Sequence, residues 1–239
     1  MALDFCYKPT GSSAQPTGPV LANLGATQGL SAGDVTRYFE LDDPTGGLGT
    51  SYDVTAFLAG GNSCGGLGAQ TFSVTVYGGH YATVVVSGAL SLTAPPTIKA
   101  FEDDLSSRPG ETGIRFIHAD GDTAYATVEV GVLGASNIFD ALFTAVTYPN
   151  SSAGQPDVDA NGYLAHGPVT TQLQARVNSV TSTPAVDSAH GSAVNQARTF
   201  FLYDTGAGGG LGGGSASKLI SCLDDGAVAS SGDVFASCE

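Results

Sequence analysis

The chain has 239 residues, enough for one large domain or two of ordinary size, and its 42% hydrophobic content excludes disorder as a description of the whole. Only 13% of the residues are charged, about half of the roughly 25% usual in soluble domains, so small polar residues must form much of the surface. A formal net charge of -14 without any basic run makes nucleic acid and anionic membranes poor partners.

Short runs rich in Val, Thr, Tyr and Phe recur along the chain, each bounded by Gly, Pro, Asn or Asp. Their apolar residues alternate with a period of two, which is typical of antiparallel sandwiches or barrels and not of alternating βαβ units. The sequence therefore predicts an all-β fold. The predicted strands are LDFCYKP (3–9), DVTRYFEL (34–41), SYDVTAFL (51–58), QTFSVTVYGG (70–79), YATVVVSG (81–88), GIRFIHA (113–119), AYATVEVGV (124–132), TQLQARV (171–177) and RTFFLYD (198–204).

Two segments depart from this pattern. In residues 135–146, Ile138, Leu142 and Val146 are four apart, as in a helical turn, but the surrounding strands favour a strand after a short turn. The Gly-rich stretch 205–217 has no phosphate-loop Lys and precedes no amphipathic helix. It predicts a loop or hairpin tip and not a nucleotide site.

Four cysteines fall into an N-terminal pair, Cys6 and Cys64, and a C-terminal pair, Cys222 and Cys238. Neither pair has the CxxC spacing of a zinc site, and a Lys-poor composition rich in Ser, Thr and Gly suits secreted proteins. We expect two local disulfides, of which the second closes a loop of roughly 15 residues and contributes about 3 kcal/mol. Four buried thiols are the alternative.

The expected disulfides predict an extracellular or cell-surface protein whose signal peptide has been removed and is absent from this chain. The chain contains no stretch of about 18 uninterrupted apolar residues, so no membrane insertion is expected.

The chain also repeats itself. Residues 81–107 align with 198–231: each has an apolar strand, a turn rich in small residues, a second strand and then Asp-Asp. We predict one repeat in 1–107 and the other in 112–239, with the boundary inside 102–112. The second repeat opens with TGIRFIHADGDTAY, for which the first repeat has no counterpart.

A sheet that lacks an edge strand presents unpaired N–H and C=O groups. Because the first repeat begins directly at ALDFCYKP, we expect its open edge beside this strand. Either the chain has been trimmed, or a strand from a neighbouring molecule fills that edge. In the second case the partner is the chain itself, as a homo-oligomer or filament. The expected assembly edge consists of Leu3, Asp4, Phe5, Cys6 and Tyr7.

RFIHADGDTAYATVEVGV (115–132) resembles the opening of the repeats in a bacterial extracellular family, domain of unknown function 4397. YATVVVSG together with IKAFEDDLSS resembles the close of such a repeat. The resemblance covers most of the chain and is specific between Tyr81 and Val130, although Asp120 and Gly121 replace the usual Ser-Pro and 150–174 fits poorly. It implies two tandem immunoglobulin-like β-sandwiches in an exported surface protein, and no reaction.

Acidic residues cluster at three turns: Asp103 with Asp104, Asp120 with Asp122, and Asp157 with Asp159. A Ca²⁺ ion takes six to eight oxygen ligands, and consecutive residues of an extended segment point to opposite faces. We therefore expect no cofactor and interpret these residues as turn-capping side chains. Ca²⁺ binding is the alternative.

The third cluster resembles an EF-hand loop in part. With Asp157 as its first residue, Gly162 occupies the sixth position, but Pro168 stands at the twelfth, where the pattern requires Glu. No flanking helices are expected, so Asx-turns at a loop tip are the preferred interpretation.

His118, flanked by Asp120 and Asp122, would suit a base held by a carboxylate or a transition-metal site. No Ser, Cys or second His is placed to complete either, so we expect a structural histidine that bonds the backbone. The remaining histidines are isolated, and they are His80, His166 and His190.

The chain has no Gly-x-Ser-x-Gly elbow, no HExxH, no dinucleotide fingerprint and no Trp for a sugar-stacking platform. The sequence therefore predicts a non-enzymatic surface structural module that self-assembles into a filament or coat by strand addition. An adhesive module for an extracellular ligand, with or without Ca²⁺, is the alternative.

Overall fold

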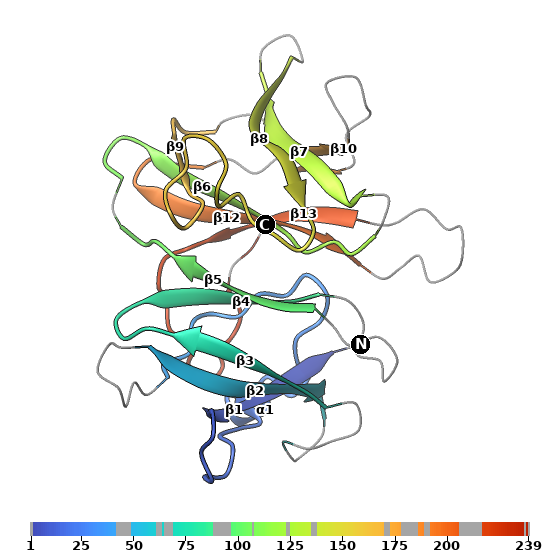
Figure 1. Ribbon diagram of the computed structural model, residues 1–239, viewed down its shortest axis with the longest axis vertical. Helices are drawn as coiled ribbons and strands as arrows, with labels where there is room; N and C mark the ends of the chain where they lie inside the picture. Colours follow the sequence, from blue (N-terminus) through green and yellow to red (C-terminus); the bar gives the residue numbers. More distant parts are fainter. Residues whose placement is uncertain are drawn as a thin grey trace. The chain divides into compact units, whose positions relative to one another are not determined.

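The computed structural model describes residues 2–41, 49–60, 64, 69–87, 97–106, 108–122, 125–134, 138–169, 173–177, 186–188, 192–205, 217–236 and 238. Within these ranges the fold is all-β, as the alternating pattern predicts, with thirteen strands and one four-residue helix (Figure 1). Several antiparallel sheets form, and none of them closes into a barrel in the described part of the chain.

The chain divides into two compact units. Unit 1 comprises Met1–Asp103 and Gly226–Ala236, and unit 2 comprises Asp104–Asp225 and Ser237–Glu239. The first change of unit thus falls inside the 102–112 segment. Residues 226–236, however, belong to unit 1 and not to the C-terminal unit in which the sequence places them.

Unit 1 contains a three-stranded sheet in the order β1-β2-β3 and a two-stranded sheet, β4-β5 (Figure 1). All of these strand pairs are antiparallel. One face of the larger sheet is apolar and buries Tyr52, Ala56 and Val74. The elements are β1 (Leu3–Pro9), α1 (Val20–Asn23), β2 (Thr50–Leu58), β3 (Gln70–Val76), β4 (Tyr81–Ser87) and β5 (Thr97–Asp103).

Unit 2 contains two four-stranded sheets, ordered β11-β10-β7-β8 and β13-β12-β6-β9. The pairs are antiparallel except β6 with β12, which run parallel. The strands are β6 (Thr112–His118), β7 (Thr127–Leu133), β8 (Phe139–Thr147), β9 (Leu164–His166), β10 (Leu173–Val177), β11 (Val186–Ser188), β12 (Gln196–Asp204) and β13 (Ser217–Leu223).

The two sheets of unit 2 share one hydrophobic core. Both contribute fully buried side chains, for example Phe116 and Phe200 from one sheet and Val130 and Leu173 from the other. Strand β6 lies between β12 and β9, and all seven of its residues are buried. The predicted opening strand of the second repeat is therefore an inner strand of its sheet, buried along its whole length.

Predictions for three individual segments have different outcomes. The segment expected to be a strand after a short turn forms β8, which confirms the strand at Phe139–Thr147. Residues 34–41, expected to be a strand, make only isolated bridges at Thr36 and Tyr38. Most of the Gly-rich stretch, residues 206–216, lies outside the described residues.

Both predicted disulfides form, Cys6–Cys64 in unit 1 and Cys222–Cys238 in unit 2. Each closes a loop within its own half of the sequence, as their spacing indicates. Two disulfides are typical of proteins that fold in an oxidising environment.

Residues 226–236, named here the clasp, complete unit 1 by pairing with residues 35–38, named the acceptor segment. On one side of the acceptor segment, Arg37 N donates to Val234 O and Ala236 N donates to Val35 O, both at 2.8 Å. Arg37 Nε also lies 3.1 Å from Asp233 Oδ1.

The other arm of the clasp pairs with the opposite side of the acceptor segment. Tyr38 N donates to Ala227 O at 3.0 Å, and Ala229 N donates to Tyr38 O at 2.7 Å. The arms meet in a tight turn in which Ser230 and Asp233 exchange backbone hydrogen bonds. The acceptor segment therefore lies between two arms of the same loop.

Candidate functional site

The outer edge of β1, expected to be open, is covered by the same chain. Leu3 N donates to Leu30 O at 2.9 Å, and Leu30 N donates back to Leu3 O at 2.7 Å. Tyr7 exchanges a second pair of backbone hydrogen bonds with Thr17, at 3.0 and 2.8 Å. Residues 17–30 thus occupy the place beside β1 that the sequence leaves for a neighbouring molecule.

Asp4 fixes this covering segment. Its carboxylate is buried, and it accepts hydrogen bonds from Leu21 N and Ala22 N, each at 2.9 Å. These amides belong to the first turn of α1, whose N–H groups have no partner within the helix. The assembly edge expected at Leu3, Asp4, Phe5, Cys6 and Tyr7 is therefore not open.

The two hairpins that align in sequence differ in their strand neighbours. Strand β12 pairs with β13 on one side and with the parallel strand β6 on the other. Its counterpart β4 pairs with β5, and no other strand within the described ranges pairs with β4.

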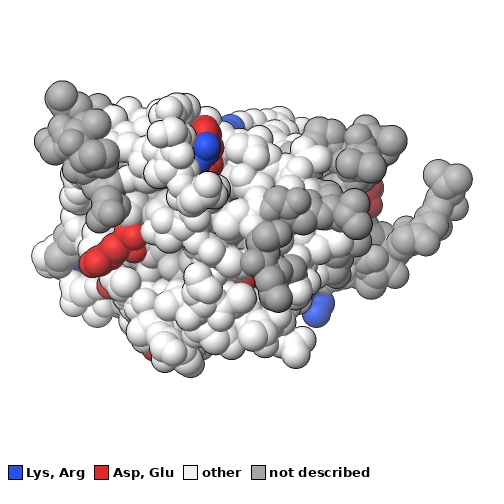
Figure 2. Space-filling view, turned by 90° about the horizontal axis from the view of Figure 1, so that it is seen from below, with Lys and Arg blue, Asp and Glu red and all other residues white. Residues whose placement is uncertain are grey.

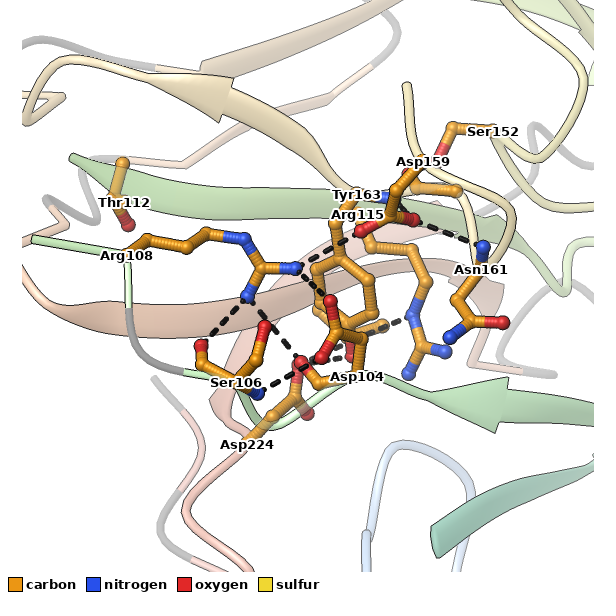
Figure 3. Close-up of polar contacts among 12 residues, drawn as sticks. Asp104, Ser106, Arg108, Thr112, Arg115, Ser152, Asp159, Asn161, Tyr163 and Asp224 are labelled. Carbon is orange, nitrogen blue, oxygen red and sulfur yellow. Dashed lines mark hydrogen bonds and ion pairs between the residues drawn. The ribbon is translucent and has the colours of Figure 1, made fainter. Parts of the chain in front are cut away.

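In unit 2, Arg108 joins two loops through a pair of carboxylates (Figure 3). Its Nη2 lies 2.7 Å from Asp104 Oδ2 and 3.0 Å from Asp159 Oδ2. Its Nη1 donates at 3.3 Å to the backbone oxygens of Asp104 and Ser106. The Arg108 side chain is 11% exposed, whereas those of Asp104 and Asp159 are 28% and 35% exposed, so the cluster is only partly desolvated.

The contacts within this cluster also change the pKa of Asp104. Burial alone would raise the pKa of this carboxyl, but hydrogen bonds from Ser106 and the charge of Arg108 outweigh burial and lower the pKa. One of those bonds is Ser106 N to Asp104 Oδ1, at 2.9 Å.

A buried tyrosine extends the cluster into the unit. The guanidinium carbons of Arg108 and Arg115 lie over the Tyr163 ring, at 4.9 and 4.6 Å from its centroid. The Tyr163 hydroxyl donates to Asp224 Oδ2 at 2.9 Å, and the Thr199 hydroxyl donates to the same oxygen at 2.8 Å. Arg115, a charged residue in a strand that is buried throughout, donates from Nε to Thr199 Oγ1 at 2.9 Å.

A cavity of about 270 Å³ opens beside Asp224. Its lining combines two carboxylates, two amides and one hydroxyl with three aliphatic side chains, which suits a small hydroxylated or cationic ligand. Tyr163 and Thr199 hold one of the carboxylates in place. The lining residues are Leu105, Ser106, Asn195, Gln196, Ala197, Leu223, Asp224 and Asp225.

The sequence does not identify this cavity, because its residues come from three separate segments. The sequence contains one local signal, an Asn directly before a strand. Asn tolerates the left-handed backbone conformation that such a turn requires, and Asn195 adopts it with φ of 61°. Arg115 carries a second signal, because a charged residue inside a buried strand needs polar partners within the core.

The six acidic candidates do not form one site. Asp103 accepts hydrogen bonds from Tyr38 Oη at 2.7 Å and from Thr83 Oγ1. Asp120 is fully buried; it accepts from Asp122 N at 2.8 Å and from the Ser217 hydroxyl. Among the residues that the structure describes, no three His, Cys, Asp or Glu side chains are placed to hold a metal ion.

The 155–164 loop contains the Asx-turn that the sequence predicts. Asp159 Oδ1 accepts from Asn161 N and Tyr163 N, each at 2.9 Å, while Oδ2 contacts Arg108. Asp157 is exposed and has φ of 63°. The ion pairs of Arg108 thus connect the turn at Asp104 with the turn at Asp159, which lie far apart in the sequence.

His118 is a buried histidine at the end of β6. Its Nε2 donates to Tyr125 O at 2.5 Å, the backbone bond that the sequence predicts, and the ring lies 6.0 Å from that of Tyr148. Nδ1 has no hydrogen-bond partner among the described residues. Burial lowers the pKa of His118, although the bond to Tyr125 and the charge of Asp120 oppose it.

Charged side chains are sparse on the face drawn in Figure 2, where they lie in isolated groups among uncharged residues. This agrees with the low charge content of the sequence. No helix in the described ranges is long and apolar enough to cross a membrane.

Comparison with known protein families and with curated proteins finds no match to this chain.

Proposed function

We propose that this protein is an exported, non-enzymatic surface module whose copies assemble into a filament or coat by strand addition. The two disulfides support an oxidising location, and the scarcity of charge on its surface suits packing against further copies. The partner that we propose is a further copy of the chain, and we propose neither nucleic acid nor a membrane as a partner.

The proposal includes the tandem immunoglobulin-like β-sandwich fold that the resemblance to domain of unknown function 4397 implies. The core shared by the two four-stranded sheets of unit 2 supports a sandwich there.

The difference between β4 and β12 is the observation that carries the proposal. Strand β12 has the parallel strand β6 beside it, whereas β4 pairs only with β5 among the described strands. The acceptor edge that we propose therefore lies beside β4, and not beside β1. A parallel strand from another copy would occupy in unit 1 the position that β6 occupies in unit 2.

The composition of β4 supports this acceptor. Proteins protect edge strands with charged residues, proline, bulges or a covering segment. Tyr81–Ser87 contains no charged residue and no proline, and Val84 is 40% exposed. By contrast, β1 is covered by residues 17–30, and β8 has register shifts against β7.

Assembly of the full chain tests the proposal. We expect particle mass to rise with concentration in light scattering and filaments or sheets to be visible by electron microscopy. Val84→Lys should abolish assembly, because a charge on an exposed edge strand opposes strand addition, whereas the matched control Val84→Thr should assemble. A wild-type protein that stays monomeric at high concentration would overturn the proposal.

The cavity in unit 2 favours a second candidate function, binding of a small hydroxylated or cationic ligand by an adhesive module. Ca²⁺ is the simplest probe, because carboxylate and amide oxygens are among its usual ligands. A rise in melting temperature with millimolar Ca²⁺ that is lost in Asp225→Asn would place binding at the cavity. Loss of the rise in Asp103→Ala or Asp157→Ala would place it at the acidic turns, and no rise in the wild type would exclude Ca²⁺.

A further inference from the structure

The clasp belongs to unit 1, but both of its ends are held by a disulfide of unit 2. The chain passes from unit 2 into unit 1 after Asp225 and returns at Ser237. Cys222 and Cys238 flank this excursion and are bonded to each other. The disulfide therefore closes a covalent loop whose central part completes the other unit.

Few buried side chains hold the clasp in place. Val234 is 4% exposed and is its main apolar anchor, whereas Val228 and Phe235 are 45% and 38% exposed. The ion pair between Arg37 and Asp233 is weak, because the Asp233 side chain is 60% exposed.

Backbone hydrogen bonds of the two arms, together with one from Gly232 N to Leu24 O at 3.1 Å, also hold the clasp, and such bonds are replaced by bonds to water when the clasp opens. Loop closure restricts the opened clasp to conformations in which its ends stay together. The disulfide thus favours the docked clasp by lowering the entropy of the open state.

We propose that Cys222–Cys238 is a redox-controlled latch for the clasp, so that reduction of a bond in unit 2 releases part of unit 1. A dithiol reductant supplies two electrons and two protons: the S–S bond breaks, two cysteine thiols form, and the dithiol becomes a disulfide. Cys222 is buried and Cys238 is partly exposed, so Cys238 is the more accessible residue of the pair. Release uncovers both sides of the acceptor segment.

Amide hydrogen exchange on the full chain measures the effect directly. In Cys222→Ser/Cys238→Ser, the amides of Arg37, Tyr38, Ala229 and Ala236 should exchange about 100-fold faster than in the wild type, as expected for loss of a loop closure of this length. The amides that pair β1 with β2 serve as the internal reference and should change far less. Unchanged protection of the clasp amides would overturn the proposal.

A reciprocal experiment keeps the proposal testable if the double variant does not fold. If the disulfide stabilises the docked clasp, docking must equally stabilise the disulfide. Val234→Ala should therefore increase the rate at which dithiothreitol opens Cys222–Cys238 roughly 5- to 10-fold, measured by alkylation and mass spectrometry.

The matched control is Val228→Ala in the same clasp, because that side chain is exposed. It should react like the wild type, and Cys6–Cys64 should open at the same rate in all three proteins. Equal opening rates of Cys222–Cys238 in the wild type, Val228→Ala and Val234→Ala would contradict the latch.

Discussion

The Tyr163 hydroxyl donates a hydrogen bond to Asp224 Oδ2 over 2.9 Å, and this bond joins the 155–164 loop to the end of β13. Tyr163 is 1% exposed. The bond therefore lies in a desolvated part of unit 2, where an unmade hydrogen bond is costly.

Tyr163→Phe should lower the free energy of unfolding by about 1–2 kcal/mol, because Asp224 loses one donor while the ring stays beside the two guanidinium groups. Urea denaturation of the full chain measures the change. Tyr77→Phe is the control, since Tyr77 is 47% exposed and should change stability by less than about 0.5 kcal/mol. Equal effects of the two substitutions would contradict the assigned role of Tyr163.

Asp4→Ala should be more costly, at about 3 kcal/mol, because it leaves the amides of Leu21 and Ala22 without their buried acceptor. Asp34→Ala is the matched control: Asp34 accepts from Ser31 N in an exposed turn, so its loss should cost less than about 1 kcal/mol. Chemical denaturation compares the two variants. A small effect of Asp4→Ala would mean that residues 17–30 cover β1 without help from this carboxylate.

The local parts of the fold could be predicted from the sequence. Alternation of apolar residues identifies many of the strands, because one face of each of these is buried, whereas all seven residues of β6 are buried. The spacing of Cys6 with Cys64 and of Cys222 with Cys238 indicates the two disulfides. The Asx-turn at Asp159 and the backbone bond of His118 also follow from local chemistry.

The pairing of distant segments could not be predicted. Residues 35–38 have the composition of a strand, but they pair with the clasp, almost 200 positions later, as the ion pair between Arg37 and Asp233 shows. The cover of β1 depends on a buried aspartate, Asp4, which looks like an ordinary charged residue in the sequence. In both cases tertiary packing determines which segments pair. Such a pairing produces no periodic pattern in the sequence.

Stability should fall as the pH drops below about 6.5, because burial lowers the pKa of His118 in the folded state. The unfolded chain binds a proton near pH 6.5 and the folded chain only at lower pH, so between these values protons favour the unfolded state. Below the folded pKa the contribution levels off. Melting temperatures between pH 8 and pH 5 should show this slope.

His118→Gln removes the titrating group and should flatten the same part of the profile. His166→Gln, at an isolated and partly exposed histidine, is the matched control substitution. A slope that survives in His118→Gln would assign the pH dependence to other groups.

Asp104→Asn should lower stability at neutral pH but have little effect near pH 2. The pKa of Asp104 is lowered in the folded protein, so its ionised form stabilises the fold above about pH 3.8, and that contribution is lost as acid protonates the carboxyl. Urea denaturation at the two pH values gives the difference. A loss of the same size at both would show that the ion pair with Arg108 contributes no pH-dependent stability.

Gly131→Ala should be one of the most destabilising Gly→Ala substitutions among the glycines that the structure describes. A Cβ atom at Gly131 would lie 2.1 Å from Asp140 O and 2.8 Å from Ala141 Cα, both of them backbone atoms of the paired strand β8. The strand pair must separate to admit it, and we expect a loss of about 2–4 kcal/mol, or failure to fold. Gly167→Ala is the control, because a Cβ there meets no described atom within 4 Å. Thermal unfolding of the two variants decides the point: similar melting temperatures would mean that β7 and β8 are not packed as closely at Gly131 as these distances require.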